Sequence, residues 1–159
     1  MKYELTSESK IVEGHTFYRG HTLYRIKATK DFGDVKIGDL GGWIEKVENL
    51  SQEGNCWVYD NAWVFDNARV YENAWVYGNA RVYDNAWVFG NAWVFGDAWV
   101  FGDAWVYGNA WVFGDAQVYE GEISKNLDVI SNKEVIAPVI IPKTISAIHW
   151  LDVLDVSTE

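Results

Sequence analysis

Between residues 55 and 120 the polar and apolar positions of the chain repeat every six residues. Each hexapeptide reads Asn or Asp, Ala, Trp (or Arg or Gln), Val, Phe or Tyr, and then Gly, Asp or Glu, with Cys56 in place of the first Ala. Valine fills the fourth position of all eleven units. A period of six fits neither a helical turn nor a long flat strand, and a recurring Gly or Asn would interrupt a helix. The pattern predicts strands of about four residues joined by corners of about two.

The same pattern predicts which side chains point inward. Side chains alternate along a strand, so Ala and Val share one side while the Trp and Phe or Tyr positions share the other. Two aromatic side chains per strand would exceed the volume that three short strands can enclose, so Ala and Val are expected inside and the rings outside. Gly, Asp and Asn suit the corners because they accept left-handed backbone angles or bond nearby amides. Stacked corners, such as Asn61 over Asn79, are expected to form amide ladders.

The prediction is an all-β fold, a triangular β-solenoid or hexapeptide-repeat β-helix. Three hexapeptides make a coil of 18 residues, so residues 55–120 give about 3.7 coils. Residues 1–54 are expected to form an N-terminal β cap, and residues 121–159 a C-terminal cap or strap. Both ends need covering because a solenoid exposes unpaired strand edges there.

Local signals outline the two ends. In the cap, strands are expected at residues 22–28 and 35–44, where they would pair with the first coil. Two prolines in residues 135–142 exclude a central strand or regular helix, so an extended segment along the solenoid is expected. Partly helical spacing of apolar residues predicts a short packing helix at 144–156.

Charge and composition exclude several classes of function. The formal net charge is −10, which argues against direct binding to nucleic acid because phosphate backbones require a basic surface. The start of the chain has no apolar leader and no apolar run is long enough to span a bilayer, so a cytoplasmic protein that does not bind membranes is expected. Since Cys56 is the one cysteine, no intrachain disulfide or cysteine zinc cluster can form.

Candidate catalytic groups are sparse. The three histidines, His15, His21 and His149, lie outside the repeat. Hexapeptide acyltransferases use a histidine base beside the cofactor, and a zinc centre of the carbonic anhydrase type needs three histidine ligands. Cys56 occupies an inward position, which suits a small apolar side chain. The sequence therefore predicts a protein that is not an enzyme and has no cofactor and no catalytic metal.

Acidic residues occupy many corners. They are Asp60, Asp66, Glu72, Asp84, Asp97, Asp103 and Asp115. Calcium binding and mimicry of an acidic nucleic acid are alternatives, but turn chemistry is the simpler explanation.

Two stretches ahead of the regular repeat are distinctive. Residues 26–44 read IKATKDFGDVKIGDLGGWI, and residues 49–62 read NLSQEGNCWVYDNA. Together with the repeat they resemble the YdcK-like hexapeptide β-solenoid proteins of bacteria and their phages, over roughly residues 20 to 120. The resemblance implies a left-handed solenoid with an N-terminal β cap. The family is often described as acyltransferase-like through its fold, but a shared fold does not establish shared chemistry.

The aromatic positions carry the strongest functional signal. An 18-residue coil places four tryptophans on one face, beside a second column of Tyr and Phe. These residues are Trp57, Trp75, Trp93 and Trp111, with Tyr59, Tyr77, Phe95 and Phe113. Stacked aromatic neighbours contribute about 0.2–1 kcal/mol per pair, so the column can be structural. An exposed apolar surface of this size is also typical of an interface.

The leading hypothesis is a non-enzymatic interaction or scaffold protein whose aromatic faces bind a second copy of the chain or another protein, such as a host protein of a phage. A homo-oligomer, dimer or trimer, is expected. The Trp face, or a neighbouring face on which Arg or Gln replaces some of the tryptophans, would be covered by a second chain or by the C-terminal segment. Carbohydrate binding through the Trp column is the alternative. An acidic nucleic-acid mimic and an acyltransferase-like enzyme are less favoured.

Overall fold

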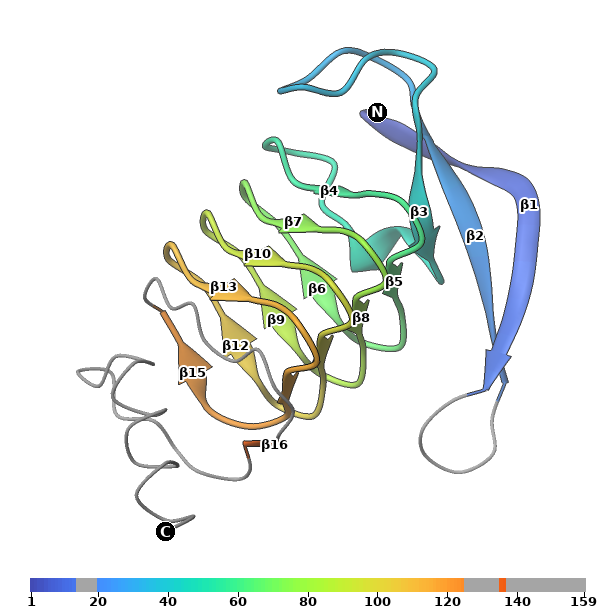
Figure 1. Cartoon of the computed structure of the whole chain (residues 1–159). Coiled ribbons are helices and arrows are strands. Elements are labelled where there is room, and N and C mark those ends of the chain that lie inside the picture. Colours follow the sequence, from blue (N-terminus) through green and yellow to red (C-terminus); the bar gives the residue numbers. More distant parts are fainter. Residues whose placement is uncertain (14–19, 125–134, 137–159) are drawn as a thin grey trace, which may run out of the picture.

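The computed structural model describes residues 1–13, 20–124 and 135–136 of the chain. From Trp57 onward the chain winds into stacked coils of three short strands each (Figure 1). Strands of successive coils pair in parallel and 18 residues apart, so that Trp57 faces Trp75 and Val58 faces Val76. The predicted all-β solenoid is therefore confirmed, and residues 55–120 make about 3.7 coils.

The repeat contributes eleven strands of two residues. They are β4 (Trp57–Val58), β5 (Trp63–Val64), β6 (Arg69–Val70), β7 (Trp75–Val76), β8 (Arg81–Val82), β9 (Trp87–Val88), β10 (Trp93–Val94), β11 (Trp99–Val100), β12 (Trp105–Val106), β13 (Trp111–Val112) and β14 (Gln117–Val118). These strands are shorter than predicted because the corner begins at once: the amide of Ala80 donates to the carbonyl of Tyr77 at 3.4 Å. The hydrogen-bond ladder still extends past each strand, since the amide of Tyr77 donates to the carbonyl of Val94 at 2.9 Å.

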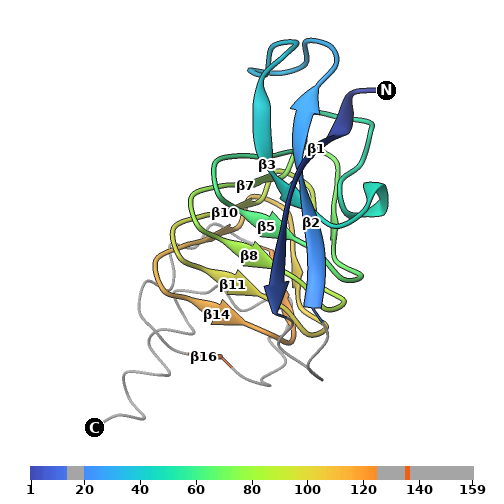
Figure 2. The same ribbon diagram turned by 90° about the vertical axis from the view of Figure 1, so that its right-hand side faces the viewer.

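Three sheets run along the solenoid. The ladder face is the sheet of β4, β7, β10 and β13. The mixed face is the sheet of β6, β9, β12 and β15 (Glu122–Ile123). The hairpin face consists of β5, β8, β11 and β14, which Figure 2 shows one below another. Its sheet continues into the N-terminal strands at one end and into β16 (Val135–Ile136) at the other.

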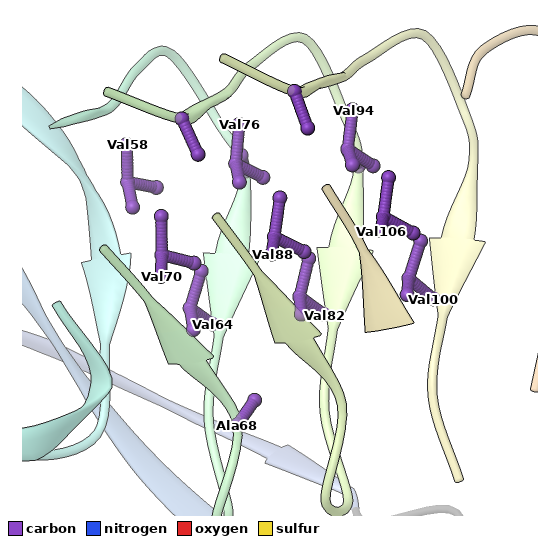
Figure 3. Packing of buried hydrophobic residues seen from close by; sticks show 14 of the residues in the cluster. Val58, Val64, Ala68, Val70, Val76, Val82, Val88, Val94, Val100 and Val106 are labelled. Atoms are coloured by element: carbon purple, nitrogen blue, oxygen red, sulfur yellow. The ribbon is translucent and has the colours of Figure 1, made fainter. Parts of the chain in front are cut away.

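The interior is lined by rows of small side chains. All eleven fourth-position valines and all second-position alanines are at most 1% exposed, as predicted. Figure 3 shows the valines of successive coils in parallel rows. Each buried valine contributes about 1.5–3 kcal/mol before entropy is counted, so this row is a large part of the driving force for folding.

Every regular corner contains a residue in the left-handed region. The ten sixth-position residues from Asp60 to Gly114 have φ between 55° and 69°. Six of the ten are glycine, which adopts such angles without strain. The first-position side chains are exposed, and four pairs of them are joined by amide hydrogen bonds of 3.3 Å. These pairs are Asn67 to Asn85, Asn79 to Asp97, Asn85 to Asp103 and Asn91 to Asn109.

Residues ahead of the repeat extend the solenoid. β1 (Tyr3–Glu13) and β2 (Gly20–Ala28) form an antiparallel hairpin, and β2 pairs with β3 (Leu40–Ile44). β3 in turn pairs in parallel with β5 of the first coil. Glycine is required at the start of this junction, because a Cβ on Gly41 would lie 2.6 Å from the carbonyl oxygen of Val58. The expected strand at 22–28 lies within β2, whereas the strand expected at 35–44 begins only at Leu40, and β1 was not expected.

A buried asparagine joins the cap to the first coil. Asn49 ends the short 3-10 helix η1 (Val47–Asn49) and is fully buried. Its Oδ1 accepts hydrogen bonds from the amides of Glu45 and Lys46, and its Nδ2 donates to the carbonyls of Asp66 and Ala68 at 3.1 and 2.9 Å. Its side-chain oxygen and nitrogen are therefore both satisfied, as burial requires.

The last described residues lie at the far end of the solenoid. β15 pairs with β12, and β16 pairs in parallel with β14. The rest of the predicted extended segment and the helix predicted at 144–156 fall outside the described residues. Within the described ranges no helix is long and apolar enough to cross a membrane.

Candidate functional site

The Trp column of the ladder face is a stack of parallel rings. The ring centroids of Trp75 and Trp93 lie 5.2 Å apart with 4° between the planes, and those of Trp93 and Trp111 lie 5.1 Å apart at 2°. In-register pairing produces this stack, because adjacent strands are separated by about 4.8 Å. Trp75 and Trp93 are half-buried and Trp111 is 39% exposed. Neighbouring rings occupy one another's faces, so the column presents mostly ring edges to solvent.

Trp57 does not belong to this exposed stack, contrary to the expectation. It is 1% exposed and packs edge-on against Tyr3 and Phe32, at centroid distances of 6.1 and 5.2 Å. Tyr3 begins β1, and Phe32 belongs to the loop between β2 and β3, so the cap covers the first ring of the column. The ladder therefore begins at Trp75.

The second aromatic column of the ladder face is half-buried throughout. Tyr77 stacks on Phe95 at 4.8 Å and Phe95 on Phe113 at 5.1 Å. Tyr59 breaks the pattern, because it meets Tyr77 at 86° instead of stacking on it. Its edge contact with Trp75 at 70° is like that of Tyr77 with Trp93 at 73°. Seven of the eight predicted residues thus lie on one partly exposed surface.

Two hollows flank the Trp column. One, of about 480 Å³, runs between the column and a row of corner asparagines, because the inward-pointing alanine between them leaves a trough. Gly33, Asp34, Asn55, Asn73, Trp75, Asn91, Trp93, Asn109 and Trp111 line it. The other, of about 410 Å³, lies between the two aromatic columns at their N-terminal end. It is lined by Asp34, Tyr59, Asp60, Trp75, Tyr77 and Trp93.

The charge around the ladder face is negative. Its four hexapeptides contain no Lys or Arg and one acidic residue, Asp60, to which the cap loop adds Asp34. Burial raises the pKa of Tyr59 to about 12, and the carboxylates of Asp34, Asp60 and Asp39 add to the increase. Asp34 and Asp60 therefore place two carboxylates at the N-terminal end of the two columns.

A larger hollow, of about 590 Å³, lies on the mixed face. Its Trp stack has two rings, Trp87 and Trp105, at 5.0 Å. The walls carry both signs of charge, because Lys46, Arg69, Glu48 and Asp103 all contribute to the lining. The ladder face remains the better candidate because its stack is longer and its strands carry no cation.

On the hairpin face, aromatic side chains that were expected outside are buried by the chain itself. Phe65 and Tyr83 are 4% and 3% exposed, and they form a second apolar cluster with Val12 of β1 and Leu23 of β2. Figure 2 shows these two strands in front of the hairpin face. The covering element is the N-terminal hairpin, which the repeat pattern does not predict. The alternation at residues 10–12 and 21–25 was the signal that could have indicated it.

Cations from the hairpin cover the Trp column of the same face. Lys10 Nζ lies 4.1 Å from the ring centroid of Trp43 and 5.0 Å from that of Trp63. The guanidinium of Arg25 lies 5.1 Å from Trp43. Such contacts contribute about 0.5–2 kcal/mol each, depending on their desolvation. The hairpin thus covers the N-terminal part of both aromatic columns, one with cations and one with aliphatic side chains.

Three of the acidic corners bind backbone amides of the next coil. Carboxylate oxygens of Asp60, Glu72 and Asp84 accept hydrogen bonds from the amides of Gly78, Gly90 and Gly102, each 18 residues further on, at 3.0–3.2 Å. Turn chemistry accounts for these residues, as the sequence suggested. Among the described residues, no group of three or more His, Cys, Asp or Glu side chains is placed to hold a metal ion.

Cys56 and Lys2 form a buried structural pair. Lys2 Nζ donates to the carbonyl oxygen of Cys56 at 2.9 Å and lies 3.4 Å from its Sγ. Burial raises the pKa of the thiol and lowers that of the ammonium group, and each group partly offsets the shift of the other. Lys2 also donates to the carbonyls of Glu53 and Gly54, so it holds the N-terminus against the first corner.

The histidine that the structure describes, His21, anchors the hairpin. Its Nδ1 lies 2.9 Å from Glu45 Oε2, and its ring packs 5.0 Å from that of Phe65. The other carboxylate oxygen of Glu45 accepts the amide of Asp66 at 2.7 Å. His15 and His149 fall outside the described residues.

Comparison with known proteins agrees with this geometry. A family model for the YdcK β-solenoid repeat matches residues 62–78, 74–90 and 80–96. The protein named "Uncharacterized acetyltransferase YdcK" from Escherichia coli (strain K12) is 55% identical over 38 residues, which are 24% of this chain and 12% of that protein. The aligned part is thus a small fraction of the relative's length. The hexapeptide repeat that forms the stacked coils seen here is therefore similar in sequence to the YdcK β-solenoid repeat.

Proposed function

We propose that this protein is a non-enzymatic interaction or scaffold protein that binds a protein partner, either a second copy of the chain or another protein, through the ladder face. One observation carries the proposal: the chain covers part of the aromatic columns of its hairpin face with its own hairpin, whereas its described residues leave the ladder face open beyond Trp57. An aromatic, charge-depleted surface of this kind has the composition of an interface core.

Stacking of the rings argues against carbohydrate binding. Sugars bind tryptophan by lying flat on an open ring face, but the facing sides of Trp75, Trp93 and Trp111 are occupied by one another at 5.2 and 5.1 Å. Edges alone remain along most of the column. A protein partner can use ring edges together with the adjoining troughs, so it is the better match.

An acetyltransferase activity, as the name of the relative suggests, has less support. The described histidine is tied to Glu45 and Phe65 beneath the hairpin, away from the open ladder face. A catalytic base has to reach the reacting proton.

The family resemblance also implies left-handed winding and a triangular cross-section, which would give the ladder face a flat, rigid form suited to docking.

The first prediction concerns association. Because Trp75 and Trp93 lie outside the valine core, the double variant Trp75→Ser/Trp93→Ser is expected to keep its β-structure while losing self-association or partner binding. Size-exclusion chromatography with light scattering measures the mass, and circular dichroism measures the fold. A dimer or trimer of the wild-type chain is expected to shift toward monomer.

The matched control is Trp87→Ser/Trp105→Ser, which removes the two-ring stack of the mixed face. This control should leave mass and binding close to those of the wild type. If the ladder variant keeps the wild-type mass and every partner that the wild type binds, the ladder is structural and the proposed function fails.

A further inference from the structure

The N-terminal hairpin shows which chemistry complements these aromatic columns. Residues two apart on an extended strand share a side, and β1 presents Lys10 and Val12 in this way while β2 presents Leu23 and Arg25. The cations lie over the Trp column, and the aliphatic side chains pack in the cluster of Phe and Tyr. Alternating cationic and aliphatic residues therefore match the alternation of Trp and Phe or Tyr along each coil.

A residue within the coils also places a cation over Trp rings. Arg81 replaces Trp in the column of the hairpin face, and its guanidinium lies 4.2 Å from the ring centroid of Trp63 and 5.2 Å from that of Trp99. A cation can therefore take the place of a ring in a Trp column. Arg81 makes this cation–π contact from within the coils, and Lys10 and Arg25 of the hairpin make it from outside them.

The ladder face has the same columns but supplies no cation of its own. Its N-terminal end is also where the parallel stack of Trp rings begins, because Trp57 packs under the cap against Phe32 and Tyr59 contacts Trp75 edge-on at 5.6 Å and 70°. The hollow of about 410 Å³ at this point places Asp34 and Asp60 beside Trp75. An aromatic ring with two flanking carboxylates is a favourable environment for a guanidinium or ammonium group.

We infer that the ladder face takes an extended, basic segment of a partner protein in which Lys or Arg alternates with Val, Leu or Ile, with one cationic side chain seated against Trp75 between Asp34 and Asp60. This partner chemistry rests on the proposed function and deepens it. Charge complementarity supports it further, because the chain carries a net charge of −10 and would attract a basic segment over a distance.

A synthetic peptide tests the inference directly. The probe is a fluorescently labelled peptide of sequence RTVSRTVSRTVS, in which Arg and Val share one side of an extended chain. Fluorescence anisotropy with the full-length protein measures its affinity at low and physiological ionic strength. Binding is expected, with weakening at higher salt. Two control peptides should bind much less: ETVSETVSETVS reverses the charge, and RVTSRVTSRVTS places Arg and Val on opposite sides.

Protein variants locate the site. Asp34→Asn/Asp60→Asn is expected to weaken peptide binding about tenfold or more, since both charge partners of the seated cation are lost. Asn retains the tolerance of position 60 for a left-handed angle. The matched control, Asp97→Asn/Asp115→Asn, removes the same charge from corners of the hairpin face and should change the affinity by less than about twofold.

The outcomes separate this inference from the proposed function. Equal binding of the acidic peptide, or equal weakening by both pairs of Asp→Asn substitutions, overturns the basic-segment inference. No binding of any peptide, together with a wild-type oligomer that Trp75→Ser/Trp93→Ser dissociates, identifies a second copy as the occupant, so the inference fails and the function stands. If neither the peptide nor any protein depends on the ladder face, both fail.

Discussion

Glu72 illustrates how single residues stabilise the corners of the coils. Its φ is +60°, an angle that costs most side chains energy, but its carboxylate accepts the amide of Gly90 at 3.0 Å. Glu72→Val places a β-branched side chain at this angle and removes the acceptor, so the free energy of unfolding should fall by about 2 kcal/mol. Urea unfolding followed by circular dichroism measures it. Arg69→Val, at an exposed strand position of the same hexapeptide, should change stability by less than about 0.5 kcal/mol. Equal losses would contradict the corner role.

The roles of single residues were predictable where they follow the period of six. Inward valine and alanine, outward tryptophan and corner glycine all follow from alternation and turn preference. The partners of the acidic corners depend on which residue lies one coil away. The hydrogen bond between Glu72 and Gly90 can therefore be predicted only once the 18-residue coil is known. The burial of Trp57 was not predictable from the repeat, because Tyr3 and Phe32 lie outside it.

At the scale of elements, the β1–β2 hairpin is attached to the solenoid through one of its sides. Leu23 is fully buried in the cluster with Phe65 and Tyr83, whereas Ile11 on the other side of the hairpin is 77% exposed. Leu23→Ala should lower the free energy of unfolding by about 2–4 kcal/mol, and Ile11→Ala should change it by less than about 0.5 kcal/mol. Thermal and urea unfolding of the two variants give the comparison. A loss that is similar in both would mean that the hairpin does not depend on this contact.

The sequence predicted the repeat better than the elements around it. Eleven copies of one hexapeptide reinforce a single interpretation, while β1 occurs once and is stabilised by contacts with residues far along the chain. Lys10, Val12, Leu23 and Arg25 form a binding surface only after the hairpin has closed. Tertiary contacts of this kind cannot be derived from local propensity. For the same reason the sequence predicted the aromatic columns but not the hairpin that covers part of one face.

At the scale of the whole molecule, the three faces differ although the repeat is nearly uniform. The hairpin face is covered in part by β1 and β2, the mixed face carries charges of both signs, and the ladder face combines the longest Trp stack with two hollows. Small departures from the repeat, such as Arg81 in a Trp position, produce these differences. A rigid core shared by all three faces allows each surface to vary without loss of the fold.

Three buried or half-buried tyrosines make the whole molecule sensitive to alkali. Burial is the main cause of the raised pKa of Tyr3, Tyr59 and Tyr83, and it raises that of Tyr59 to about 12 from an ordinary value of 10.0. A neutral phenol is thus favoured by the fold, and its contribution to stability is fully present below pH 10, the unfolded value, and is lost as the pH rises toward 12. Urea midpoints should therefore fall steeply between pH 9.5 and 11.5, while absorbance near 295 nm reports phenolate formation together with unfolding. Tyr59→Phe, which cannot ionise, should reduce this fall and change the free energy of unfolding little near pH 7. A wild-type chain whose urea midpoint is constant up to pH 11.5 would show instead that these phenols are accessible in the fold.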